Sequence, residues 1–183
     1  MKPLFVLFSF TCLSLITSCN NKVVPLQQTY QDKPYQFSVA ASKDQVWTRL
    51  IDVLTSKGLA IKTIDKNSGL ITTDHTSFLS SYFFESKNGS LTNPNAIVVC
   101  TKVRGPFTFA TSLKPESIAG QWTVITKQAD DKTLVDIRLT NASGKVVVVE
   151  DGGTYGQGVT RETHNLLVKS TGVFEKSVEN DLK

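Results

Sequence analysis

The chain contains few side chains that could catalyse a reaction, and their spacing does not bring them together. The two histidines, His75 and His164, lie far apart in the sequence. A metal site needs several donors at ligand spacing, and scattered residues do not define a Ser–His–Asp arrangement. The acidic pairs at 130–131 and 150–151 flank expected strands, and they could act as acid and base only across a cleft. We therefore expect surface or cap histidines, and we predict no catalytic residue, metal or cofactor.

A glycine-rich stretch, "GGTYGQG" at 152–158, suggests a second kind of chemistry. Glycines before a helix can present backbone N–H groups to a phosphate. This stretch lacks the Gly-Lys-Ser/Thr ending of a P-loop and the Gly-x-Gly-x-x-Gly spacing of a dinucleotide site. A flexible connection explains it without a ligand, and phosphate binding is the alternative.

The opening residues are typical of an export signal. Lys2 precedes an apolar run from Leu4 to Ile16, which has the length of a signal-peptide core and is too short to span a bilayer comfortably. The sequence Ile-Thr-Ser at 16–18, followed by Cys19, resembles the lipobox of bacterial lipoproteins. This resemblance implies cleavage before Cys19, diacylglycerol on its sulfur and usually acylation of the new amino terminus. Two or more acyl chains anchor a protein stably, since each buried methylene contributes about 0.8 kcal/mol.

An alternative is an ordinary secretory signal cleaved after Ser18, which would leave Cys19 as a free thiol. Asn20 stands where inner-membrane retention signals usually have Asp, and this favours an outer-membrane anchor facing the periplasm. The expected partners are therefore the membrane, through acyl chains on Cys19, and another envelope protein.

The remaining cysteines and the charges limit other functions. Cys12 would leave with the signal, so Cys100 has no partner for an intramolecular disulfide. It lies in the strand-like run 96–103, where a buried small hydrophobe is expected and a catalytic thiol is the alternative. The net charge of +4 comes from scattered residues, whereas nucleic-acid binding needs a basic stripe with interleaved aromatics. We predict no nucleic-acid partner.

The mature chain, without the signal peptide, has the length of one compact domain and a short tether. We expect a signal peptide over 1–18, an acylated flexible tether over 19–34 and a single domain over 35–183. The tether prediction rests on a polar stretch that contains two prolines and has no periodicity.

The pattern of the domain predicts an α+β fold, in which an antiparallel sheet is packed by an N-terminal helix and a long C-terminal helix. A half-buried strand at 35–41 precedes the first helix, for which Ser42 and Gln45 form a capping box and Gly58 ends the helix. A hairpin follows, with its turn at 65–69.

Alternation and turn residues predict the second half of the domain. We expect the long terminal helix to contain Gly172 in its interior, closely packed against the sheet. The expected strands are 96–104, 121–128, 133–140 and 145–150, with turns at 129–131 and 141–144 and a further strand near 107–110.

Four aromatic residues, Phe78, Tyr82, Phe83 and Phe84, lie in an otherwise polar segment that we expect to be a long loop. They could cover an open end of the core. They could instead form an exposed patch for a partner protein or a lipid surface, which makes them the candidate partner-binding residues.

Two segments resemble a known family. The stretch 42–73, with Val-Trp, Leu, Gly-Leu and Asp-Lys-Asn-Ser-Gly-Leu-Ile-Thr, together with 170–182, looks like the repeat unit of BamC, a lipoprotein of the outer-membrane β-barrel assembly machinery. The resemblance implies a BamC-like helix-grip domain and carries no catalytic residue. The sequence therefore favours a non-enzymatic, membrane-anchored binding or scaffold module in envelope assembly or maintenance. A carrier of a small apolar ligand, bound between sheet and terminal helix, is the alternative, and a hydrolase is a weaker one.

Overall fold

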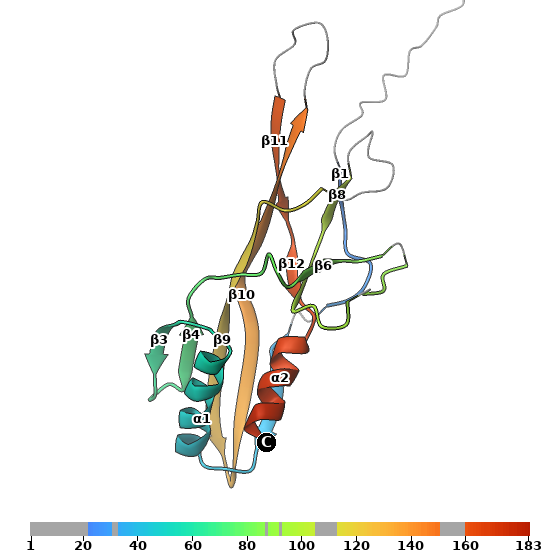
Figure 1. The fold of residues 1–183 in the computed structure, drawn as a ribbon. Coiled ribbons are helices and arrows are strands. Elements are labelled where there is room, and N and C mark those ends of the chain that lie inside the picture. The colour runs from blue at the N-terminus through green and yellow to red at the C-terminus, as the bar shows by residue number, and fades with distance from the viewer. Residues whose placement is uncertain (1–21, 31–32, 87, 92, 105–112, 151–159) are drawn as a thin grey trace, which may run out of the picture.

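The structure, a computed structural model, describes residues 22–30, 33–86, 88–91, 93–104, 113–150 and 160–183. The described residues form two helices and mostly antiparallel sheets, which confirms the predicted α+β class (Figure 1). In chain order the elements are β1 (Lys22–Val24), β2 (Tyr35–Val39), α1 (Lys43–Ser56), β3 (Ile61–Asp65), β4 (Leu70–Thr73), β5 (Thr76–Ser77), β6 (Tyr82–Phe84), β7 (Val98–Cys100), β8 (Lys102–Arg104), β9 (Ser117–Ala129), β10 (Lys132–Glu150), β11 (Thr160–Leu166), β12 (Val168–Ser170) and α2 (Val173–Leu182).

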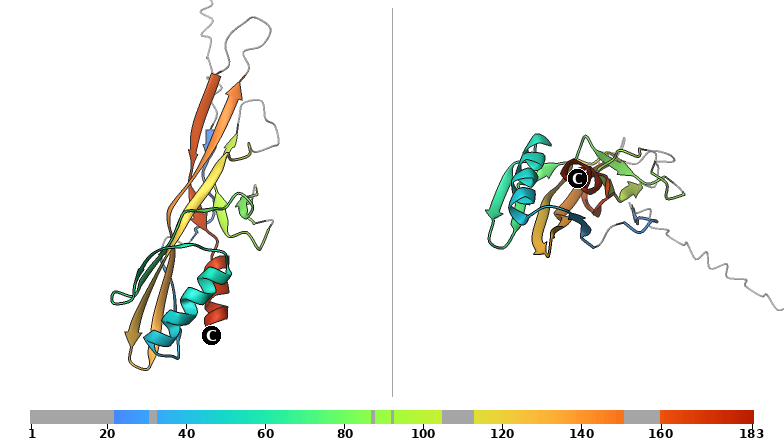
Figure 2. Two further views of the ribbon diagram at one scale, coloured as in Figure 1. Left: turned by 60° about the vertical axis from the view of Figure 1, so that its left-hand side comes forward. Right: turned by 90° about the horizontal axis from the view of Figure 1, so that it is seen from below.

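The long β9–β10 hairpin is the centre of the fold. Its turn lies at the predicted place, and Asp130 closes it with φ 52°. The apolar side chains of both strands alternate with polar ones, so that Trp122, Val124, Val135 and Ile137 are fully buried. Both helices pack on one face of this hairpin, as the views in Figures 1 and 2 show. The sheet thus has one face covered by helices.

A β-bulge replaces the turn that the sequence predicts at 141–144. The register of β10 against β9 shifts between Thr140 and Ser143, and Asn141 has φ 50°. Asn tolerates this left-handed conformation, so the residues that suggest a turn serve equally well in a bulge. The predicted strands 133–140 and 145–150 are consequently one continuous strand. Before the bulge β10 pairs with β2, and after it β10 pairs with β11.

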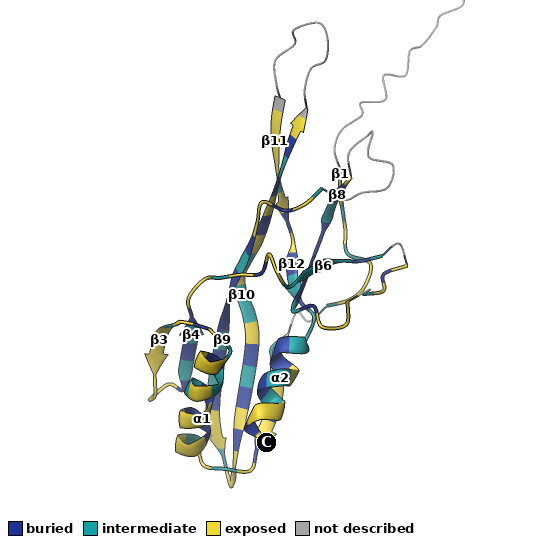
Figure 3. Cartoon of the chain, viewed as in Figure 1, coloured by how far each residue is buried: buried dark blue, intermediate teal, exposed yellow. Residues whose placement is uncertain are grey.

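Helix α1 forms as the sequence predicts. The Ser42 side chain accepts a hydrogen bond from the Gln45 backbone N–H, and the Gln45 side chain accepts one from the Ser42 backbone N–H. Gly58 has φ 77°, as expected of a residue that ends a helix. The buried stripe of α1 comprises Val46, Trp47, Leu50 and Leu54 (Figure 3).

The terminal helix is shorter than predicted. Residues 160–166 and 168–170 are strands β11 and β12, and α2 begins at Val173. Gly172 is the N-cap, with φ 86°, and does not lie inside the helix. The apolar residues of 166–170 fit a period of two as well as a helical period: Leu166, Val168 and Ser170 are buried while Leu167 is exposed.

Within the segment expected to be a flexible tether, 19–34, the described residues 22–28 pack against the domain. Strand β1 pairs with β8, and the backbone N–H groups of Gln27 and Gln28 donate hydrogen bonds to the Glu85 carboxylate at 2.6 and 2.9 Å. Composition alone suggests flexibility here, because the partners lie far along the sequence. Neither described helix is long and apolar enough to cross a membrane.

Candidate binding groove

A groove of about 400 Å³ lies where the start of α2, the end of α1 and the segment after β5 meet over strand β9. The described residues that line it are Lys57, Leu59, Thr76, Ser77, Phe78, Ser81, Asn95, Ile97, Trp122, Val173, Phe174 and Ser177. Part of the predicted aromatic segment therefore contributes to this groove.

Three aromatic rings form the apolar part of the groove. Trp122, from the central strand β9, stacks on Phe174 of α2 with ring centroids 4.1 Å apart and planes 22° apart. Phe78 approaches Trp122 edge-on, with centroids 6.3 Å apart. Offset stacking and edge contacts are favourable beyond the area they bury, so this cluster is a closely packed floor of the groove, and its rings are only 1–6 % exposed.

Polar side chains form the rest of the groove, and its cation is already paired. Lys57 Nζ lies 2.7 Å from Ser177 Oγ and 2.6 Å from Asp181 Oδ2. The hydroxyls of Ser77 and Ser81 and the amide of Asn95 add donors and acceptors that carry no charge. The groove is thus suited to an apolar group flanked by hydrogen-bonding groups.

The structure separates the four predicted aromatic residues. Phe78 is 2 % exposed and belongs to the core. Tyr82 and Phe84 contact each other edge-on, with centroids 5.4 Å apart, and both pack against the core from β6. Residues 82–84 of the segment, where a loop is predicted, form strand β6 parallel to β7, and Phe83 alternates to the opposite side. The four rings do not form one exposed patch.

Glu85, which the sequence analysis did not single out, holds the N-terminal segment in place. Its side chain is buried, and the Lys102 Nζ donates to its backbone carbonyl at 3.0 Å. Desolvation acts to raise the pKa of Glu85, but the amides of Gln27 and Gln28, with Tyr30 and Lys102, outweigh it and hold the pKa below its ordinary value. The carboxylate is therefore ionised in the folded protein.

The groups considered for catalysis are not assembled into a reactive site in the described residues. His75 follows β4, and His164 lies on β11, 3.3 Å from the Glu162 carboxylate and not at a helix start. Cys100 is 1 % exposed, and burial raises the pKa of its thiol to about 12, which confirms the buried role predicted for it. Among the described residues no group of His, Cys, Asp and Glu could hold a metal ion. Cys19, 152–158 and the strand expected near 107–110 lie outside the described residues.

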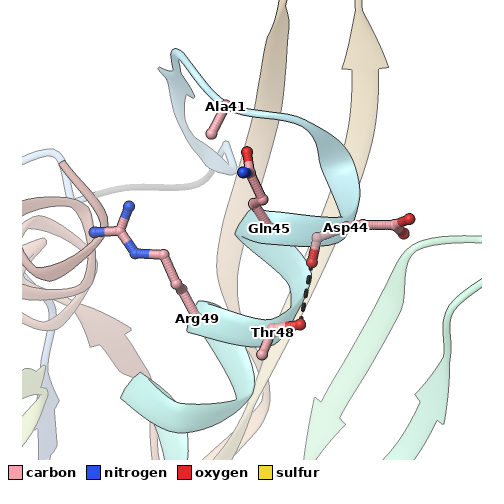
Figure 4. Close-up of a pocket in the computed structure, with 5 residues that line it drawn as sticks. All are labelled: Ala41, Asp44, Gln45, Thr48 and Arg49. Carbon is pink, nitrogen blue, oxygen red and sulfur yellow. Dashed lines mark hydrogen bonds between the residues drawn. The ribbon is translucent and has the colours of Figure 1, made fainter.

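A second hollow, of about 620 Å³, lies at the start of α1 and is shown in Figure 4. The side chain of Thr48 donates to the backbone carbonyl of Asp44 at 3.2 Å, and Arg49 Nη2 donates to the Asp181 carbonyl at 3.2 Å. These contacts fix the helix and join it to α2. The lining residues, Ala41, Asp44, Gln45, Thr48 and Arg49, offer no aromatic surface, so the groove is the better candidate.

Sequence reasoning assigned the right residues to the core without finding the groove. Trp122 lies in the predicted strand 121–128 and Phe174 in the predicted terminal helix, and both residues are buried in the structure. Their stacking depends on how α2 lies across β9, and no local pattern encodes that arrangement.

No protein-family model matches this chain, and no curated protein was found to be similar to it.

Proposed function

We propose that this protein is a lipid-anchored envelope lipoprotein facing the periplasm, whose helix-grip-like, BamC-like domain is a non-enzymatic module that binds another envelope protein. The groove is its contact site. The observation that supports this role is a groove whose floor is a closely packed aromatic cluster and whose sides carry uncharged polar side chains and a paired lysine. Such a surface favours an apolar side chain of a partner together with hydrogen bonds to its backbone.

The anchor part of the proposal rests on the sequence before the domain. The lipobox-like residues at 16–18 and Cys19 support acylation, and Asn20 supports retention in the outer membrane. The non-enzymatic part is supported by His164 on β11 and the buried thiol of Cys100, neither of which lines the groove.

Site-specific photocrosslinking in intact cells tests the partner role. A photoreactive residue replaces Asn95, which is exposed at the groove, and the matched control replaces Lys62, exposed on the edge strand β3. We expect a discrete adduct with one envelope protein from position 95 and none from position 62. Adducts that are equally weak at both positions would contradict the proposed contact site.

A carrier of a small apolar ligand is the second candidate, because a 400 Å³ groove with stacked rings can enclose such a group. A Ser177→Phe substitution would fill the groove, whereas Ser56→Phe on α1, whose residue does not line the groove, is the control. If the carrier function holds, binding of a long-chain fatty acid or of an apolar fluorophore is lost in the first variant and retained in the second. Absence of binding by the unsubstituted protein would exclude the carrier function.

A further inference from the structure

We propose that the anchor end of this domain binds anionic lipid headgroups of the membrane through Lys22 and Arg104. The inference rests on the proposed lipid anchor at Cys19 and adds to it a specific contact between the folded domain and the lipid surface.

The first observation is a pair of like charges in strands β1 and β8. Lys22 and Arg104 are directly opposite each other in this antiparallel pair, so their side chains project from the same face. Both residues are exposed, and neither has an ion-pair partner in the part of the chain that the structure describes. Like charges opposite each other destabilise a strand pair, and an anion bound between them removes that repulsion.

The surroundings of this pair are also basic. Strand β12 lies near β1, since Val23 and Lys169 line the same hollow, and the paired lengths 144–150 of β10 and 160–166 of β11 lie toward the same end of the molecule (Figure 1). The acidic residues on these strands or bonded to them are Glu85, Glu116, Glu150 and Glu162, whereas the basic residues of these strands are Lys22, Lys102, Arg104, Lys145, Arg161 and Lys169. At the opposite end acidic and basic residues are mixed, as in α1 with Lys43, Asp44, Arg49 and Asp52. An excess of one charge at one end is the electrostatic footprint of an anionic partner.

The position of the pair identifies that partner. Lys22 is three residues after Cys19, so the extended chain allows a separation of only about 11 Å between them. Figures 1 and 2 show β1 at the same end of the molecule as β11, away from the C-terminus of α2. Exposed apolar side chains also lie at this end: Val23, 42 % exposed, projects from the other face of the β1–β8 pair, and Val149 on β10 is 56 % exposed. Cations mixed with apolar side chains suit the interface of a bilayer, whereas a free phosphate site would require converging donors.

The rate at which Lys22 reacts with a water-soluble acetylating reagent tests the inference. The acylated protein, with its N-terminal acyl chains confirmed by mass, is reconstituted into vesicles of phosphatidylcholine with or without phosphatidylglycerol. We expect the anionic lipid to slow acetylation of Lys22 about fivefold. This factor corresponds to the attraction of about 1 kcal/mol between one basic residue and an anionic surface. Lys62 on β3 is the control, and its rate should be equal in both vesicles. High salt should remove the difference.

An Arg104→Gln variant with an unchanged melting temperature should lose most of the protection of Lys22. Equal Lys22 rates in both vesicle types, with the acyl chains present, would overturn the headgroup contact and leave the proposed anchor intact. If inorganic phosphate added to the neutral vesicles slows acetylation of Lys22 as much as the anionic lipid does, the pair is a site for free anions. That result would also overturn the headgroup contact. A mature protein without acyl chains would instead refute the anchor on which the inference rests.

Discussion

At the residue scale, the buried carboxyl group of Glu175 is the least expected feature. It lies in the first turn of α2, is 1 % exposed, and its Oε2 has no hydrogen-bond partner in the described part of the chain. Desolvation raises the pKa of Glu175, and a hydrogen bond with Ser170 offsets this only in part. The folded state therefore favours the protonated carboxyl group.

This raised pKa predicts a stability that falls as the pH rises. The unfolded chain releases the proton near a pKa of about 4.3, while the folded chain still holds it. Between that value and the higher folded pKa, the free energy of unfolding should decrease by up to about 1.4 kcal/mol per pH unit through this group. A Glu175→Gln variant should lack this component. Urea unfolding of both proteins from pH 4 to pH 8 measures the difference, and parallel curves would contradict the prediction.

At the element scale, the β3–β4 hairpin depends on a close approach between backbones. Gly69 has φ 73°, and a Cβ built there would lie 2.2 Å from the Thr126 carbonyl oxygen. The Thr126 N–H donates to the Gly69 carbonyl at 2.8 Å, so this contact joins the hairpin to β9. Gly58 has a similar φ of 77° but has nothing within 4 Å of its Cβ position.

The two glycines therefore form a matched pair for mutation. Gly58→Ala should reduce the free energy of unfolding by about 1 kcal/mol, the strain of an L-residue in the left-handed region. Gly69→Ala should reduce it by roughly 3 kcal/mol or more, since the backbone of β9 must also move. Denaturant unfolding compares them. Equal losses would show that the close approach at Gly69 is not limiting.

The elements that local signals define were predicted well from the sequence. The capping box of α1, the turn at 65–69 and the turn at Asp130 are each contained in a few neighbouring residues. The prediction was wrong where one local pattern fits two structures. The residues at 141–144 fit a turn or a bulge, and those before α2 fit a helix or a strand. The groove and the Glu85 contacts depend on residues distant in the sequence, and a single sequence does not specify such pairs.

At the scale of the whole molecule, Glu85 attaches the N-terminal segment to the domain. Its carboxylate accepts two backbone N–H groups across 58 and 57 positions of sequence. The segment around Gln27 and Gln28 is therefore held against the domain, and under the proposed lipid anchor at Cys19 it is the link between anchor and domain.

Replacement of Glu85 should release this segment. A Glu85→Ala variant leaves two amides without their acceptor, and we expect a loss of about 2 kcal/mol in the free energy of unfolding. Hydrogen exchange at Gln27, Gln28 and β1 should become faster, while exposed Glu116→Ala is the control. Because the pKa of Glu85 is lowered, its carboxylate adds to the free energy of unfolding at a pH above the ordinary pKa of about 4.3. This stabilisation is lost as the pH falls below that value. Unchanged exchange in the Glu85→Ala variant would contradict this role.

The pairing of β1 and β2 with late strands has a consequence for the order of folding. β2 pairs with β10, and the Thr133 hydroxyl donates to the Ala41 carbonyl across 92 positions. Because the chain is synthesised from its N-terminus, β1 has no partner until β8 has been made, and β2 has none until β10 has been made. Such distant pairings slow folding, because a long loop must close before they form. The residues before β2 thus stay unpaired during synthesis, and under the proposed lipid anchor this leaves time for modification of Cys19 before the domain folds.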